Sequence, residues 1–168
     1  CCSDLFEEQF MLPKPFVGSF GVVSNDGIPK PNFWGFKILS QLYKNRLSVA
    51  KRTNEDIEYA AFVEGSKTQV LLFTQSQDYF KDETYEIDVE VNTSADKVTA
   101  QIIDDTHCNP KAEWIKLGKP DNLTREQVAD IKERTRLVAE EVPFSSENGM
   151  VRIKVSMKTN EVVLLTIE

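Results

Sequence analysis

The chain has 168 residues, with 20 Lys and Arg against 27 Asp and Glu, which gives a formal net charge of −7 at pH 7. This length excludes a complete (β/α)8 barrel, which takes about 250 residues, while a hydrophobic content of 40% is enough for a folded core. The acidic balance argues against a nucleic-acid groove and against an anionic membrane surface as partner, because both need clustered Lys and Arg. An uncharged ligand or another protein domain fits this composition.

The cysteines and apolar runs indicate the cellular compartment. Cys1, Cys2 and Cys108 form no C-x-x-C pair, so we expect no zinc or other metal site, and their expected role is that of small hydrophobic residues in a reducing compartment. No apolar run approaches the roughly 20 residues of a membrane span, and no signal peptide is recognisable, so the expected localisation is cytoplasmic. The first residue is Cys rather than Met, which suggests part of a longer protein.

The first third of the chain predicts one short strand and one helix. Residues 18–24 resemble a strand, and Asn-Asp-Gly at 25–27 indicates a turn. Pro31 suits the first position of a helix, where no N–H partner is needed. We expect this helix to be buried on two sides, because its apolar residues cover more than one face. They are Phe33, Trp34, Phe36, Ile38, Leu39, Leu42 and Tyr43.

The remaining pattern is mainly that of antiparallel strands. Residues 57–64 and 69–74 read as a hairpin joined at Gly65-Ser66. Residues 84–91 and 97–103 alternate between apolar and polar side chains, as half-exposed strands do. The final strands are expected at residues 151–157 and 162–167, with a turn at 158–161.

Two helices interrupt these strands. Asn109-Pro110 is typical of a helix N-terminus, and Gly118 of its end. Thr124 and Gln127 form a capping box, from which apolar residues at helical spacing run to Val138. With about seven short strands, the predicted fold is mainly β: an antiparallel β-sandwich with one leading helix and an inserted helical pair.

Several strings in this order are similar to the end of a glycoside hydrolase family 39 enzyme. That family contains the β-xylosidases and is related to the α-L-iduronidases. The matching strings are Ser3-Asp-Leu-Phe-Glu-Glu8, Asp26-Gly-Ile-Pro-Lys-Pro31, Phe33-Trp-Gly-Phe36, Ile103-Asp-Asp-Thr-His-Cys-Asn-Pro110 and Leu123-Thr-Arg-Glu-Gln127.

The resemblance implies how the chain is organised, because family members place a (β/α)8 barrel before a β-sandwich. Residues 1–45 would be the remnant of the last β/α unit of that barrel. Residues 46–168 would be an accessory β-sandwich, with the helical insert at about 108–138. The absent barrel would then be the partner of this chain, and the exposed barrel helix could instead mediate self-association.

The resemblance also implies that the chain lacks catalytic residues. Family members are retaining glycosidases, which need two carboxyl groups about 5–5.5 Å apart, and in the family these glutamates follow the fourth and seventh barrel strands, upstream of the residues matched here. The parent enzyme would degrade xylan and xylo-oligosaccharides without a cofactor, and this chain alone would be inactive. Glu7 and Glu8 match acidic residues at the barrel mouth and would bind substrate in a complete barrel only. Otherwise they are a solvated acidic pair.

Other candidates have structural interpretations. The single histidine, His107, is expected to pack or cap near the helical insert, and Asp104-Asp105 to form a turn or cap. Tyr79 and Phe80 could stack on sugar rings or anchor a loop. The alternative function is therefore an autonomous carbohydrate-binding β-sandwich that binds xylo-oligosaccharide, for which a strip of exposed aromatic residues on one sheet face is expected.

Overall fold

The computed structural model describes residues 14–16, 21–49, 54–78 and 80–168. The chain forms two compact units, Cys1–Ser40 with Asp105–Leu137 and Gln41–Asp104 with Val138–Glu168. Each unit has a hydrophobic cluster of its own. Among the described residues, no helix is both long and apolar enough to cross a membrane.

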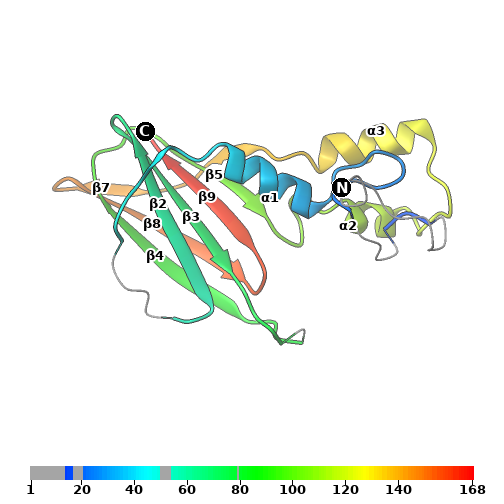
Figure 1. Cartoon of the computed structure of the whole chain (residues 1–168), viewed down its shortest axis with the longest axis horizontal. Coiled ribbons are helices and arrows are strands. Elements are labelled where there is room, and N and C mark those ends of the chain that lie inside the picture. Colours follow the sequence, from blue (N-terminus) through cyan, green and yellow to red (C-terminus); the bar gives the residue numbers. More distant parts are fainter. Residues whose placement is uncertain (1–13, 17–20, 50–53, 79) are drawn as a thin grey trace. The chain divides into compact units, whose positions relative to one another are not determined.

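The second unit is a β-sandwich of antiparallel strands (Figure 1). In its described part, one sheet has six strands in the order β1-β2-β3-β9-β5-β6 and the other has three in the order β4-β8-β7. The strands are β1 (Asn45–Arg46), β2 (Ile57–Glu64), β3 (Lys67–Thr74), β4 (Thr84–Asn92), β5 (Val98–Ile103), β6 (Ala139–Glu141), β7 (Ser145–Glu147), β8 (Met150–Lys158) and β9 (Val162–Ile167).

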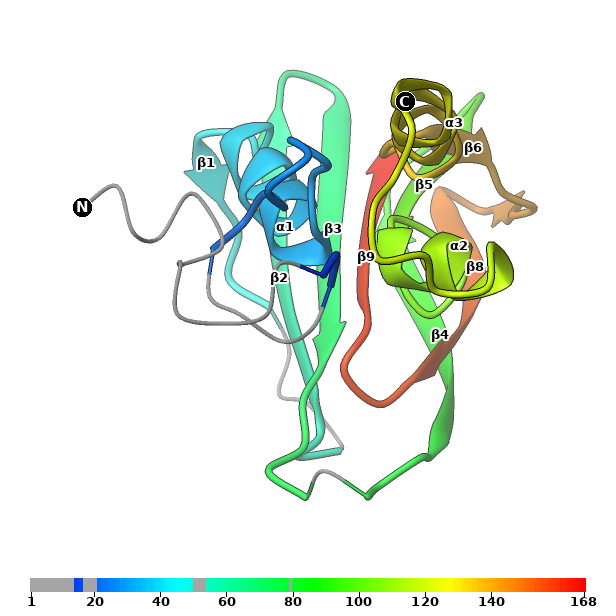
Figure 2. The ribbon, with the colours of Figure 1, turned by 90° about the vertical axis from the view of Figure 1, so that its right-hand side faces the viewer.

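The sandwich core follows from the alternation of side chains along the strands. Successive side chains of a strand point to opposite faces, so every second residue can enter the space between the sheets. In β4 the buried residues are Tyr85 and Val89, and in β8 they include Val151, Ile153 and Met157. The intervening residues of both strands are mostly charged and exposed. The predicted alternation of residues 84–91 is therefore confirmed, and β8 alternates in the same way. Figure 2 shows the strands of the two sheets as separate layers.

Strand β9 occupies the centre of the larger sheet. It pairs with β3 through residues 68–73 on one side and with β5 through residues 98–103 on the other. The turn that leads into it is held by a buried network, in which the Glu161 N–H donates to Thr74 Oγ1 at 2.9 Å and the Lys158 N–H donates to Glu161 Oε2 at 2.7 Å. The last strand in sequence thus has a hydrogen-bonded neighbour on both sides.

The first unit contains the helices α1 (Pro31–Ser40), α2 (Pro110–Lys116) and α3 (Arg125–Arg134). Both predicted N-terminal caps are present. Asn109 Oδ1 accepts the Ala112 N–H at 3.2 Å, and Thr124 and Gln127 exchange side-chain-to-backbone hydrogen bonds in the capping box. These bonds satisfy N–H groups that would otherwise have no partner at the start of each helix.

The helical pair packs against an earlier part of the chain. Phe16 and Ile28 join Trp114 of α2 and Ile131 of α3 in one buried cluster. The rings of Phe16 and Trp114 lie 6.1 Å apart, and Trp114 Nε1 donates to the Pro120 carbonyl at 2.9 Å. The helices inserted between β5 and β6 therefore share a core with residues that precede α1.

Several element boundaries differ from the predicted ones. The leading helix ends at Ser40, before Tyr43, and α3 ends at Arg134, so that the exposed Val138 follows the helix. The short strands β1, β6 and β7 were not predicted, because two or three exposed residues carry no periodicity. Within residues 18–24, the described Val23 forms an isolated bridge to Pro29. The predicted boundary at residue 45 between barrel remnant and sandwich stays a prediction.

The core of the sandwich can be tested with two neighbouring substitutions on β8. Ile153→Ala should lower the free energy of unfolding by about 2–5 kcal/mol, because it leaves a cavity where a side chain that is 1% exposed had packed. Lys154→Ala, on the exposed face, should change it by less than about 0.5 kcal/mol. Urea unfolding monitored by circular dichroism measures both values, and equal losses would contradict the assigned faces.

Candidate functional site

The predicted substrate-binding residues, Glu7 and Glu8, lie outside the described residues, as do Cys1, Cys2 and Tyr79. Their roles stay predictions. Of the described candidates, Cys108 is buried, as predicted, with 2% of its surface exposed. His107 is exposed in the segment before α2, where its Nδ1 lies 3.1 Å from Thr106 Oγ1. No group of three or more metal-ligating side chains occurs among the described residues.

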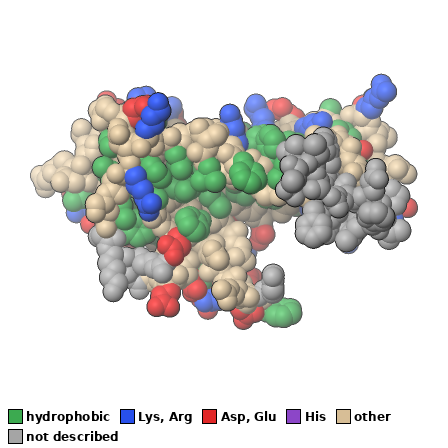
Figure 3. All heavy atoms as spheres, in the orientation of Figure 1, with side chains coloured by type: hydrophobic (Ala, Val, Ile, Leu, Met, Phe, Trp, Pro, Cys, Tyr) green, Lys and Arg blue, Asp and Glu red, His purple; other side chains and the backbone are tan. Residues whose placement is uncertain are grey.

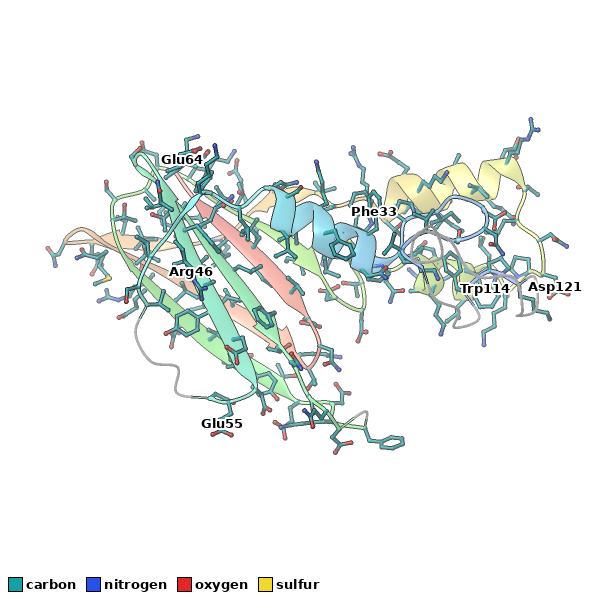
Figure 4. The ribbon with its side chains drawn as sticks, in the orientation of Figure 1. Phe33, Arg46, Glu55, Glu64, Trp114 and Asp121 are labelled. Atoms are coloured by element: carbon teal, nitrogen blue, oxygen red, sulfur yellow. The ribbon has the colours of Figure 1, made fainter. Side chains whose placement is uncertain are left out.

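Helix α1 carries an exposed apolar face. Phe33, Phe36 and Leu39 lie three residues apart, which places them on one side of an α-helix. Their exposed fractions are 36%, 65% and 55%, whereas Ile38 is buried. The Phe33 ring meets the neighbouring Trp34 ring edge-on, with centroids 5.1 Å apart (Figure 4). Burial of large apolar side chains is favourable, so this face is suited to contact with another protein surface.

The described N-terminal segment is fixed to the helical pair of the same unit. Besides the Phe16–Trp114 contact, Lys14 Nζ forms an ion pair of 2.8 Å with Asp121 (Figure 4). Both side chains are largely exposed, so the pair adds little stability and mainly orients the segment. The aromatic contact therefore does most to hold residues 14–16 in place.

A polar cluster anchors the connection between β3 and β4. Lys81 Nζ lies 2.7 Å from Asp56 Oδ2, and the Tyr85 hydroxyl donates to the same oxygen at 3.2 Å. The Lys81 hydrogen bond is the main reason why the pKa of Asp56 lies below its usual value, and burial opposes the shift. Next to Lys81 stands Phe80, with 95% of its surface exposed. The cluster thus holds a loop that presents one aromatic ring to solvent.

Sequence reasoning singled out Phe80 but not the cluster beneath it. Asp56 lies directly before β2, Lys81 lies in the loop and Tyr85 lies in β4, and the three are separated by up to 29 positions. No local spacing identifies such a group, because its members come from different sheets and meet only when the two sheets pack face to face.

The anchoring can be tested by substituting Lys81 with Met. The pKa of Asp56 should then rise towards its ordinary value, because the charge that favours the carboxylate is gone. A carboxyl group with a lowered folded-state pKa stabilises the fold above its unfolded pKa of about 3.9, and that stabilisation disappears as pH falls through the folded value. The variant should therefore be less stable than the wild type at pH 7, and the difference should shrink in acid.

Carbon-detected NMR titration of Asp56 and urea unfolding at several pH values measure both effects. Lys44→Met, at an exposed lysine of the same unit, is the matched control. A stability difference that is independent of pH would contradict the role given to Asp56.

Comparisons with known proteins agree with the predicted resemblance. A family model described as glycosyl hydrolases family 39 matches residues 1–151. A β-xylosidase of Caldicellulosiruptor saccharolyticus is 26% identical over 170 residues, covering 99% of this chain and 35% of that protein. A β-xylosidase of Geobacillus stearothermophilus is 26% identical over 171 residues, covering 99% of this chain and 32% of that protein. The chain therefore spans about a third of the length of these curated relatives.

The fold of this chain also resembles that of solved structures. The crystal structure of a family 39 enzyme from Xanthomonas axonopodis pv. citri matches with a TM-score of 0.70 at 23% identity, covering 93% of this chain and 33% of that one. This likeness supports the sandwich and its helices as a fold. The family match over residues 1–151 shows that the chain belongs to glycosyl hydrolase family 39.

Proposed function

We propose that this chain is the accessory C-terminal part of a β-xylosidase-like retaining glycoside hydrolase, and that it does not hydrolyse glycosides alone. The observation that carries the proposal is the sheet topology. Every strand pairing in the described part is antiparallel. A (β/α)8 barrel consists of parallel strands, and its active site lies at their C-terminal ends. The described residues thus contain a sandwich but no such barrel.

The exposed face of α1 supports a barrel as the partner. In a (β/α)8 barrel the helices form an outer ring packed on the strands, so a barrel helix needs an apolar face. Phe33, Phe36 and Leu39 supply such a face and are exposed in this chain. We infer that a catalytic barrel covers them. Self-association through the same face is the competing outcome.

Inactivity is tested by incubating the purified chain with an aryl β-xyloside. We expect no release of the aryl group above background, because the two carboxyl groups of a retaining glycosidase would have to come from the barrel. A folded sample, verified by circular dichroism, and an active β-xylosidase are the controls. Turnover that co-elutes with the chain in size-exclusion chromatography would refute the proposal.

The barrel contact is tested with a separately expressed family 39 barrel. Phe36→Lys should weaken its binding about tenfold or more, because burial of one Phe side chain stabilises by roughly 1.5–3 kcal/mol. Lys37→Ala, at an exposed polar position of the same helix, should leave the affinity within about threefold. Calorimetry gives both affinities. Equal effects, or light scattering that shows dimers abolished by Phe36→Lys, would oppose a barrel and favour self-association.

A second function, autonomous carbohydrate binding, has one observation in its favour, the exposed ring of Phe80. Against it, none of the exposed large hydrophobic residues in the described part of the chain lies on a strand, whereas the alternative predicted an exposed aromatic strip on one sheet face. Titration with a xylo-oligosaccharide decides between the two. Saturable binding that Phe80→Ala removes would favour a binding module, and no heat at millimolar ligand would favour the accessory role.

A further inference from the structure

The hairpin of β7 and β8 is closed by a loop of two residues, Asn148 and Gly149. Glu147 and Met150 pair on either side of it. Both loop residues are exposed and have left-handed backbone angles, with φ of 53° at Asn148 and 74° at Gly149. These are the angles of a type I′ turn, for which Asn-Gly is a preferred pair. The hairpin projects from the sandwich at the left of Figure 1, and its tip is tan in Figure 3, as expected for backbone and uncharged polar side chains.

Asn148 is the only asparagine of the sequence that precedes a glycine. This pair has a chemistry of its own, because the amide nitrogen of a residue can attack the side-chain carbonyl carbon of the asparagine before it. Glycine leaves its nitrogen least hindered, since it has no Cβ. Apart from the two chain neighbours, no heavy atom of the described residues lies within 4 Å of the position that a Cβ on Gly149 would take. The surroundings of the loop therefore leave room for the attack.

Two other asparagines outside the helices and strands are hindered in the same reaction. Asn160, between β8 and β9, also has a left-handed φ, of 66°, but its Oδ1 accepts the Ser76 N–H at 3.3 Å. The residue after it is Glu161, which is 9% exposed. Asn109 precedes Pro110, whose nitrogen has no proton to give up. Asn148 thus differs from both in the residue that follows it and in its open surroundings.

The turn has to open before the reaction, because the five-membered ring that forms includes the Cα–C bond of Asn148 and fixes it at an angle that a type I′ turn does not have. Opening is expected to be easy at this edge of the sheet. Strand β7 has three residues, all exposed, and in the described part of the chain it pairs with β8 only. Such short, exposed edges open at a low cost in free energy. Strand β8 itself is held by its pairing with β4 over all nine residues.

We propose that Asn148 is a site of spontaneous deamidation, whose isoaspartate product detaches β7 from the sheet. The Gly149 nitrogen bonds to Asn148 Cγ and loses its proton, the bond from Cγ to the side-chain amide nitrogen breaks, and ammonia leaves with that proton. Water, the only other reactant, then opens the resulting succinimide at one of its two carbonyl groups. Opening at one carbonyl gives Asp. Opening at the other gives isoaspartate, in which the backbone runs through Cβ and Cγ.

The isoaspartate product has one more backbone carbon in the loop. A two-residue type I′ turn depends on fixed angles at both of its residues, so the longer loop no longer aligns Glu147 with Met150. Once β7 has left, the edge of β8 lies open from Met150 to Arg152, and an open edge can pair with other chains. The core stays closed, because Val151 and Ile153 remain paired with β4.

The test is to age the purified chain in mildly alkaline buffer, which favours removal of the Gly149 proton, and to map its peptides by mass spectrometry. Exchange of the amide for an acid should appear at least about tenfold faster at Asn148 than at the exposed Asn122. A protein isoaspartate methyltransferase should methylate the product. Hydrogen exchange of the aged chain should be faster along β7 and unchanged along β4.

Two substitutions at the same position are the matched controls. Asn148→Gly places a residue there that accepts the left-handed turn and has no side-chain amide, so its β7 should stay protected on ageing. Freshly purified Asn148→Asp carries the added charge without the longer backbone, so its β7 should stay protected as well. Equal rates at Asn148 and Asn122 would overturn the proposal, as would isoaspartate at Asn148 that leaves exchange along β7 unchanged.

Discussion

The whole sandwich depends on burying the inward side chains of two sheets of unequal width. The aliphatic residues of β8 and β9 meet in the middle, where Val151, Ile153 and Leu165 are almost completely enclosed. Removing such apolar surface from water is the main favourable contribution to folding. Polar residues are then left to the outer faces, and this division places the carboxylates of Glu86, Asp88 and Glu90 on the exposed face of β4.

The same constraint explains which parts of the fold could be predicted. The strands with clear alternation or continuous apolar runs, such as β4 and β9, were predicted within a few residues. Both helix caps of the inserted pair were predicted as well, because a cap is a contact between residues three positions apart. The hydrophobic pattern of the sequence does not show which strands pair with each other. The strand order and the edge position of β4 result from contacts between residues far apart in sequence.

In the first unit, too, contacts between residues far apart in sequence could not be predicted. The helical pair was predicted as an insert in the sandwich, and both helices begin at the predicted caps. The Phe16–Trp114 contact, however, joins residues almost a hundred positions apart and could not be read from either segment. The excess of apolar residues in α1 was the one sign of a long-range contact that the sequence showed. A helix with aromatic residues on more than one face needs more contacting protein surface than the rest of this chain provides.

The central position of β9 has a consequence for how the protein is made. Strands β3 and β5 do not pair with each other, and β9 lies between them and pairs with both. The larger sheet therefore cannot form completely until Ile167 has left the ribosome. Contacts such as Thr68 with Ile167 are also far apart in sequence, which slows folding. Domains generally fold as they emerge, the N-terminal ones first. Any domain translated before this sandwich would therefore have time to fold first and could act as a template on which the sandwich is completed.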